Sequence, residues 1–162
     1  MNVRRFGRLD ARVPAPADEA FLEALYLDCR PDLGALPVPR SVIEGIARHQ
    51  RALQVEDYAL RFPALETWLV LDHKRPVARV VLAGEANGLR VVDLSVALAA
   101  RRKGIAGCIL RALQDECARI TLRVRTGNLA ARRLYEGLGF TLLRADDDTM
   151  ELGWRQKREH PN

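Results

Sequence analysis

A short basic segment is the part of this sequence best suited to bind an anion. Arg101-Arg102-Lys103-Gly104 follows an apolar run and precedes a stretch with helical periodicity, so it should lie at a helix N-terminus. The first amides of a helix have no intrahelical partner, and the helix dipole makes that end partly positive. Gly104 lets the backbone approach a ligand closely, and Ala106 keeps a following position small. This segment could bind a diphosphate, although a glycine before a helix is often only a turn.

Three further side chains could do chemistry near this segment. Asp93 shares one face of the preceding predicted strand with Ser95 and is the best general-base candidate, although a solvated or ion-paired carboxylate is the more ordinary role. Asn128 stands where it would cap a short helix. Tyr135 lies on the apolar stripe of that helix, where core packing is the default for a tyrosine.

Metal and disulfide chemistry find no support in the sequence. The three histidines are scattered, and neither an HExxH nor a CxxC spacing occurs, so we predict no metal site. Cys29, Cys108 and Cys117 cannot all pair with one another, and we expect them to be buried packing residues in a reducing compartment.

The elements that would position these residues alternate between helical and strand periodicity. A loosely alternating first strand is predicted over Arg4–Val13. Asp18 is a candidate N-cap for a first helix, and Ser41 with Glu44 forms a capping box that would open a second. The remaining predicted elements are strands at 67–72, 77–85 and 89–96, a helix at 104–118, a strand at 120–125, a short helix from 128 to 138, and a hairpin of 140–145 with 149–154. This order indicates a mixed α/β three-layer domain.

Composition narrows the class of protein further. The chain has 162 residues, of which 48% are hydrophobic and 29% charged, as in ordinary soluble domains. Its apolar runs are far shorter than the roughly 18 residues that a membrane span needs. The net charge of +5 is spread along the chain, whereas nucleic-acid binding usually concentrates positive charge on one element. We therefore expect a cytoplasmic protein with one domain over residues 1–155, a solvated tail at 156–162, and no membrane partner. A nucleic-acid-associated protein stays open as a weaker alternative, which only the excess of arginine supports.

Two segments together resemble the signatures of the GNAT superfamily of N-acetyltransferases. Arg101-x-x-Gly104-x-Ala106 resembles the pyrophosphate loop R/Q-x-x-G-x-G/A of that family, and the preceding Leu94–Val96 resembles its short strand segment. A second signature of the family is similar to Asn128-x-x-Ala131-x-x-Leu134-Tyr135-x-x-x-Gly139-Phe140. One departure is Ala97-Leu98-Ala99-Ala100, where many members have an acidic or polar residue followed by proline.

The resemblance implies a GNAT-like αβα sandwich, an α+β mixture of about four helices on a mostly antiparallel sheet of six or seven strands. It also implies an acetyl-CoA-dependent N-acetyltransferase without a metal. By this resemblance, the CoA pyrophosphate would be held around Arg101 by the backbone of Arg102, Lys103, Gly104, Ile105, Ala106 and Gly107. The pantetheine arm would pair with Leu94, Ser95 and Val96, and Asn128 would contact it. Tyr135 would protonate the departing thiolate.

The acceptor and the degree of activity stay open at this point. The acceptor would be a primary amine of a small molecule or a protein, attacking directly in a ternary complex. The acidic turn Asp146-Asp147-Asp148 could attract a cationic amine, although such turns more often serve solubility. An alternative is a CoA-binding partner or regulatory module with little turnover. A homodimer is an expectation at the level of the family only.

Overall fold

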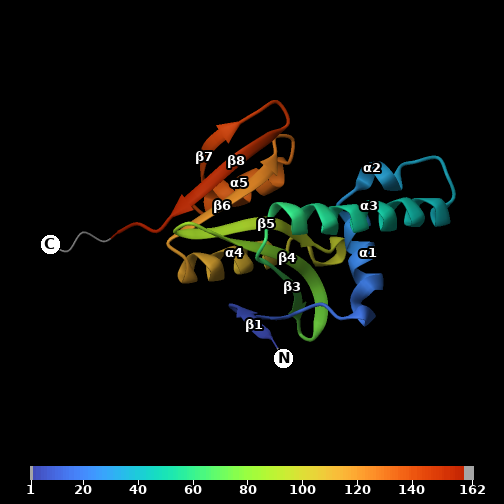
Figure 1. Ribbon diagram of the computed structural model, residues 1–162, viewed down its shortest axis with the longest axis horizontal. Coiled ribbons are helices and arrows are strands. Elements are labelled where there is room, and N and C mark those ends of the chain that lie inside the picture. The colour runs from blue at the N-terminus through green and yellow to red at the C-terminus, as the bar shows by residue number, and fades with distance from the viewer. Residues whose placement is uncertain (1, 159–162) are drawn as a thin grey trace.

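The computed structural model describes residues 2–158, which form an eight-stranded sheet with helices on both faces (Figure 1). The strand order is β1-β2-β3-β4-β5-β6-β8-β7. All neighbours are antiparallel except β5 and β6, which are parallel. The strands are β1 Val3–Phe6, β2 Leu9–Arg12, β3 Leu65–Asp72, β4 Arg75–Glu85, β5 Gly88–Val96, β6 Arg119–Arg125, β7 Thr141–Ala145 and β8 Thr149–Arg155. The predicted three-layer α+β fold is thus confirmed, with eight strands in place of six or seven.

The additional strand comes from the N-terminal segment. The single strand predicted over Arg4–Val13 is wrong, because the chain reverses between β1 and β2. Gly7 makes the turn with a φ of +58°, a conformation that L side chains rarely adopt. A Cβ atom at this position would also lie 3.0 Å from the Sγ of Cys108 on the neighbouring helix.

Helices cover both faces of the sheet. The helices are α1 Glu19–Asp28, α2 Pro31–Gly34, α3 Arg40–Arg61, α4 Ile105–Glu116 and α5 Leu129–Gly137, and the 3-10 turns are η1 Pro16–Asp18 and η2 Leu98–Ala100. On one face, α1 packs Leu22 and Leu25 against Leu69 of β3. On the other face, α4 and α5 pack against the apolar side of β3 to β6. No helix within residues 2–158 is long and apolar enough to cross a membrane.

Two predicted helix starts differ from the structure. Ser41 and Glu44 do not form a capping box, because α3 already begins at Arg40 after Pro39, whose fixed φ suits a helix start. Asp18 precedes α1, but its side chain does not cap that helix. It instead accepts hydrogen bonds from the guanidinium of Arg12, at 2.6 and 3.0 Å, and from the amide of Ala15.

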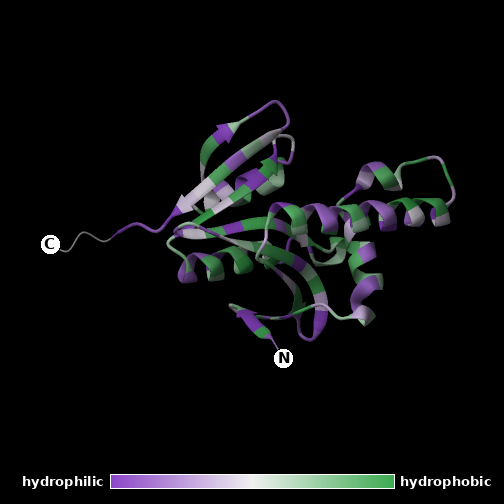
Figure 2. Ribbon diagram, in the orientation of Figure 1, coloured by the Kyte–Doolittle hydropathy of each residue, from purple (hydrophilic) through white to green (hydrophobic). Residues whose placement is uncertain are grey.

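The main core lies between the sheet and α4. Ile105, Ile109, Leu110 and Leu113 of α4 are buried against Val80 and other apolar side chains of the central strands. Burying such a side chain contributes about 1.5–3 kcal/mol. Figure 2 shows hydrophobic residues concentrated on the central strands and on α4, and mixed hydropathy along α3.

The pairing of β5 with β6 is short. It covers only Leu89 with Ile120, Arg90 with Thr121, and Val91 with Leu122, after which β5 continues along β4 alone. A polar network closes this junction: Arg90 pairs with Glu151 and donates to the Oγ1 of Thr121, which donates to Glu85 at 2.8 Å. The two strands are therefore joined at one end and separate beyond it.

The predicted C-terminal tail is only partly within the described residues. Gln156 follows β8 and donates from its amide to the carbonyl of Ala118 at 2.9 Å, so the tail begins attached to the domain. Residues 156–158 form neither helix nor strand, and residues 159–162 lie outside the described part of the chain.

Candidate active site

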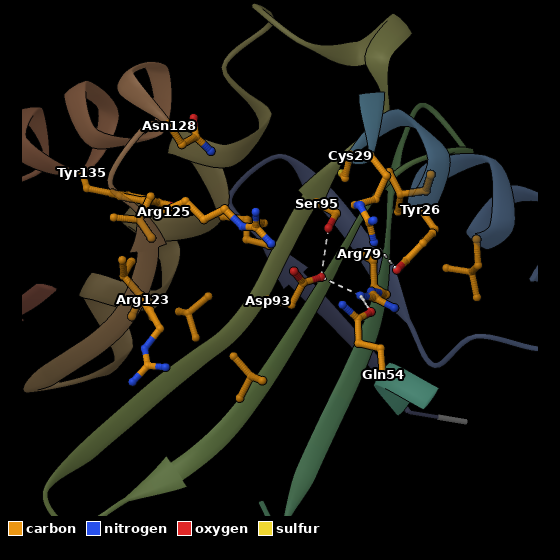
Figure 3. A pocket seen from close by; sticks show the side chains of 18 residues that line it. Tyr26, Cys29, Gln54, Arg79, Asp93, Ser95, Arg123, Arg125, Asn128 and Tyr135 are labelled. Carbon is orange, nitrogen blue, oxygen red and sulfur yellow. Dashed lines mark hydrogen bonds and ion pairs between the residues drawn. The ribbon is translucent and has the colours of Figure 1, made fainter. Parts of the chain in front are cut away.

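A cavity of about 350 Å³ opens where β5 and β6 separate (Figure 3). Its walls come from the second halves of β5 and β6, from Arg79 of β4, from α1 and α3, and from α5 with its N-cap. Asp93, Leu94 and Ser95 line it from β5, and Asn128 and Tyr135 line it from the α5 side. The structure thus brings together residues that lie more than 30 positions apart in the sequence.

The wall formed by β5 has a free backbone edge. Asp93, Leu94, Ser95 and Val96 pair with β4 on one side, while within residues 2–158 no strand pairs with their other side. Such an edge presents unpaired amides and carbonyls to an extended ligand. A bulge at Val92, where the register with β4 shifts, re-aims the residues that follow. Asp93 therefore comes directly after the bulge.

Asp93 is held in an ion pair on the face covered by α1 and α3. Its Oδ2 accepts from the Nη2 of Arg79 at 2.6 Å and from the Oγ of Ser95 at 2.9 Å. Arg79 is only 7% exposed and also donates to the Oε1 of Gln54 on α3. The role of Asp93 as general base stays a prediction, and the ion pair is the arrangement observed.

Tyr135 lies between the core and the cavity. Its ring packs against Phe140, with 5.9 Å between ring centroids, and against the main core. Burial, reinforced by the negative charge of Asp93, raises the pKa of the Tyr135 phenol to about 12. The hydroxyl is therefore protonated at neutral pH and could donate that proton to a group with a lower pKa as negative charge develops on it.

Asn128 caps α5 and also lines the cavity. Its Oδ1 accepts from the amide of Ala131 at 3.2 Å, which satisfies one of the unpaired donors of the helix. Its Nδ2 group has no hydrogen-bond partner among residues 2–158 and can donate to a ligand.

The basic segment before α4 lies beside the cavity rather than in its wall. Gly104 has a φ of +73° and precedes the first turn of α4, whose first amides lack intrahelical partners. A Cβ atom on Gly104 would meet no atom within 4 Å, so the space beside it is open. The guanidinium of Arg101 is engaged by the fold itself, because it donates to the carbonyls of Val96 and Asp28 at 3.1 and 3.0 Å.

The predicted cofactor residues divide between two hollows. Leu94, Ser95, Asn128 and Tyr135 line the first. Lys103 and Gly104 line a second hollow of about 400 Å³, together with Arg8 and Arg111. The other predicted cofactor residues line neither hollow: Val96, Arg101, Arg102, Ile105, Ala106 and Gly107.

Several polar residues of the cavity were not predicted from the sequence. Tyr26 enters it from α1, Arg30 from the link between α1 and α2, and Gln54 from α3, which nothing in their own spacing indicates. Arg79 could have been noticed, because it is a charged residue inside the apolar run of β4. Cys29 lines the cavity and is exposed, so the expectation that it is a buried packing residue is wrong. Within residues 2–158, no cluster of His, Cys, Asp and Glu side chains has the arrangement of a metal site.

Comparison with known proteins assigns both the domain and the fold. Residues 63–142 match the model of the acetyltransferase (GNAT) domain. The structure is similar to that of the PaiA N-acetyltransferase from Thermoplasma acidophilum in complex with coenzyme A, with 14% identity, a TM-score of 0.64, and coverage of 91% of this chain and 99% of that one. It is also similar to the ribosomal-protein-S18-alanine N-acetyltransferase from Escherichia coli, with 19% identity, a TM-score of 0.59, and coverage of 95% and 97%. Among curated proteins, no sequence matches this chain significantly.

Proposed function

Because this chain belongs to the GNAT acetyltransferases, whose domain its residues 63–142 match, we propose that it transfers an acetyl group from acetyl-CoA to a primary amine. The acceptor is a small molecule or a protein. The observation that carries the proposal is the free edge of β5 beside a cavity that also contains a protonated phenol, that of Tyr135.

The proposal places the cofactor along the free edge of β5 and across the start of α4. The pantetheine arm pairs with the open edge of Leu94, Ser95 and Val96, and Asn128 donates to it from Nδ2. The pyrophosphate lies at the start of α4, against the amides from Arg102 to Gly107. The left-handed Gly104, the unpaired first amides of α4 and the adjacent Lys103 support this placement, because a helix N-terminus beside a basic side chain favours a diphosphate.

The chemistry requires little from the protein beyond orientation and one proton. The neutral amine attacks the thioester carbonyl carbon, a C–N bond forms, the C–S bond breaks, and the amine proton leaves to water. Tyr135 donates its proton to the departing sulfur and recovers one from solvent. A thiol has a pKa near 8.5, so transfer from a phenol with a pKa of about 12 is uphill but is driven by collapse of the tetrahedral adduct.

A second candidate function is cofactor binding without efficient turnover. The observation that favours it is the ion pair of Asp93 with Arg79, which already occupies the best general-base candidate of the cavity. In that case the protein would act as a CoA-responsive partner or regulatory module. The two functions share the cofactor-binding residues. They differ in turnover: removal of the Tyr135 hydroxyl should slow acetyl transfer only if the protein is an acetyltransferase.

The test combines cofactor titration with one hydroxyl deletion. Acetyl-CoA at 100 times its Kd should stabilise the fold by about 2.7 kcal/mol and raise Tm by several degrees. Replacement Tyr135→Phe should lower kcat for acetylation of an amine panel about 100-fold, with the acetyl-CoA Kd changed less than about threefold.

Tyr58→Phe is the matched control. The Tyr58 phenol also has a pKa raised to about 12, first by burial and then by Asp93, but it does not line the cavity. An equal loss of kcat in both variants would contradict the role of Tyr135. Absence of any acetyl-CoA response at millimolar concentration would refute the proposed function.

A further inference from the structure

The cavity has an excess of positive charge. Four arginines line it, Arg30, Arg79, Arg123 and Arg125, against the single carboxylate of Asp93. An amine-binding site that must hold a cationic acceptor would be expected to have the opposite balance.

Two of these arginines are already neutralised by the protein. Arg79 forms the ion pair with Asp93 described above. Arg30 pairs with Asp32 at 2.8 Å and donates to the hydroxyl of Tyr26 at 2.9 Å. Their charges therefore support the wall of the cavity and add little to the field that a ligand meets.

The other two arginines lie on β6 and are less completely neutralised. Arg123 and Arg125 are alternate residues of one strand, so both face the same side of the sheet, and both are exposed. The Nη2 of Arg123 lies 3.8 Å from Glu151, a carboxylate already engaged by Arg90 and Arg144. Arg125 has no ion-pair partner within residues 2–158. Figure 3 shows its side chain extending from β6 toward Asp93 and Ser95 on β5.

The position of this pair separates it from the cofactor phosphates. Arg123 and Arg125 do not line the second hollow, where Lys103 and Gly104 mark the start of α4. They share the first cavity with Tyr26 and Gln54, which come from the helices covering the same face. Their charge thus faces the side from which an acceptor would reach the gap between β5 and β6.

The acidic turn offers no competing site for a cationic acceptor. The carboxylate of Asp146 accepts from the amides of Asp148 and Thr149 at 3.0 and 2.8 Å, so it closes the turn between β7 and β8. None of the three aspartates of this turn lines the cavity.

We propose that the acceptor is a primary amine whose own molecule carries a carboxylate, bound by Arg125 with the support of Arg123. This inference rests on the proposed acetyltransferase function. A guanidinium binds a carboxylate through two parallel hydrogen bonds and so fixes the orientation of the attached amine. The same positive charge lowers the pKa of a nearby amine and increases its neutral, nucleophilic fraction. That effect compensates for a general base held in an ion pair.

The test uses acceptor pairs that differ by one charge. Release of CoA from acetyl-CoA is measured with the α-amides of glutamic acid and glutamine, and with C-terminally amidated peptides beginning Ala-Glu or Ala-Gln. The first pair represents free amino acids as the source of the carboxylate, and the second represents an acidic protein N-terminus. Wild type, Arg125→Gln and Arg123→Gln are compared with Arg75→Gln, which removes one exposed charge at the β3–β4 turn.

In wild type and Arg75→Gln, kcat/KM should be about tenfold higher for the carboxylate member of at least one pair, since a hydrogen bond to a charged group is involved. In Arg125→Gln the preference should fall to about twofold or less, through KM, while the acetyl-CoA Kd stays unchanged. Transfer without any preference in wild type overturns this inference and leaves the acetyltransferase function standing. A weaker acetyl-CoA affinity in Arg125→Gln, with the preference for the carboxylate acceptor unchanged, has the same consequence. Absence of transfer to any amine refutes both.

Discussion

The polar network at the junction of β5 and β6 makes a quantitative prediction about stability. Glu151 is the anion of this network: it pairs with Arg90, and its other oxygen lies 3.5 Å from Arg144. The side chains of Arg90 and Glu151 are only 11% and 20% exposed. Glu151→Gln removes the negative charge while keeping size and a hydrogen-bond acceptor, so Arg90 would be left buried without a counter-ion.

The expected loss of unfolding free energy is about 2 kcal/mol. Removing one partner of a fully buried ion pair costs about 3–5 kcal/mol, and the partial exposure and the retained acceptor reduce that value. For a domain of this size, about 2 kcal/mol corresponds to a decrease in Tm of roughly 4–8 °C. The double variant Arg90→Met/Glu151→Leu should be more stable than Glu151→Gln, because it leaves no unpaired buried charge.

The pH dependence gives an independent check with a defined sign. Burial alone would raise the pKa of Glu151, but the hydrogen bond and charge of Arg90 outweigh it and lower the pKa from its ordinary value of 4.5. The carboxylate therefore stabilises the fold above that value, and its contribution is lost as the pH falls through the lowered pKa. The difference between wild type and Glu151→Gln should shrink accordingly in acid.

Urea denaturation at neutral and acidic pH measures both effects. Glu44→Gln is the matched control, because Glu44 forms an exposed pair with Arg40 on α3 and such pairs contribute about 0.3–0.5 kcal/mol. If Glu151→Gln costs no more than Glu44→Gln at neutral pH, or if the loss grows in acid, the reasoning about the buried pair is refuted.

Two further predictions concern single residues. Arg12 and the Ala15 amide hold the pKa of Asp18 at about 2. The Asp18 carboxylate should therefore add roughly 2 kcal/mol to the free energy of unfolding above pH 4, and this contribution should be lost as the pH falls toward 2. Asp18→Asn should flatten this part of the pH profile of stability, measured by urea denaturation. Gly104→Ala should cost only about 1 kcal/mol, because its φ of +73° is strained for alanine but its Cβ meets no atom within 4 Å. Its acetyl-CoA affinity, measured by calorimetry, should nevertheless fall about tenfold if the phosphates occupy that open space, and an unchanged Kd would contradict their placement there.

The sequence predicted the elements that depend on local patterns. The strand–turn–helix around Gly104 and the helix from Asn128 both rest on hydrophobic periodicity and turn residues close in the chain, and both are observed. The hairpin at Gly7 was missed because its two strands are only four residues long each, too short for alternation to reveal a reversal. The start of α3 was misplaced because the fixed φ of Pro39 outweighed a side-chain cap.

The features of the cavity that were missed depend on distant parts of the chain. Arg79 meets Asp93 across two paired strands, and the strand register with its bulge at Val92 is not encoded in either segment alone. The exposure of Arg125 to the cavity requires β5 and β6 to separate beyond Val91. Residue types could suggest a base or an anion site, but only the sheet order shows which charges are already paired.

The junction of β5 and β6, with its three residue pairs, also separates the sheet into two groups of strands. On one side, β1 to β5 form a group of antiparallel strands that ends at Val96. On the other side, β6, β8 and β7 form a smaller antiparallel group that begins at Arg119. The two groups of strands are joined across the sheet by only three residue pairs, and the chain passes from one group to the other through η2 and α4. The junction is thus the natural boundary between two units of cooperative unfolding. A cofactor lying along β5 and against α5 would contact both units. It would therefore stabilise their association and slow amide hydrogen exchange in the C-terminal strands.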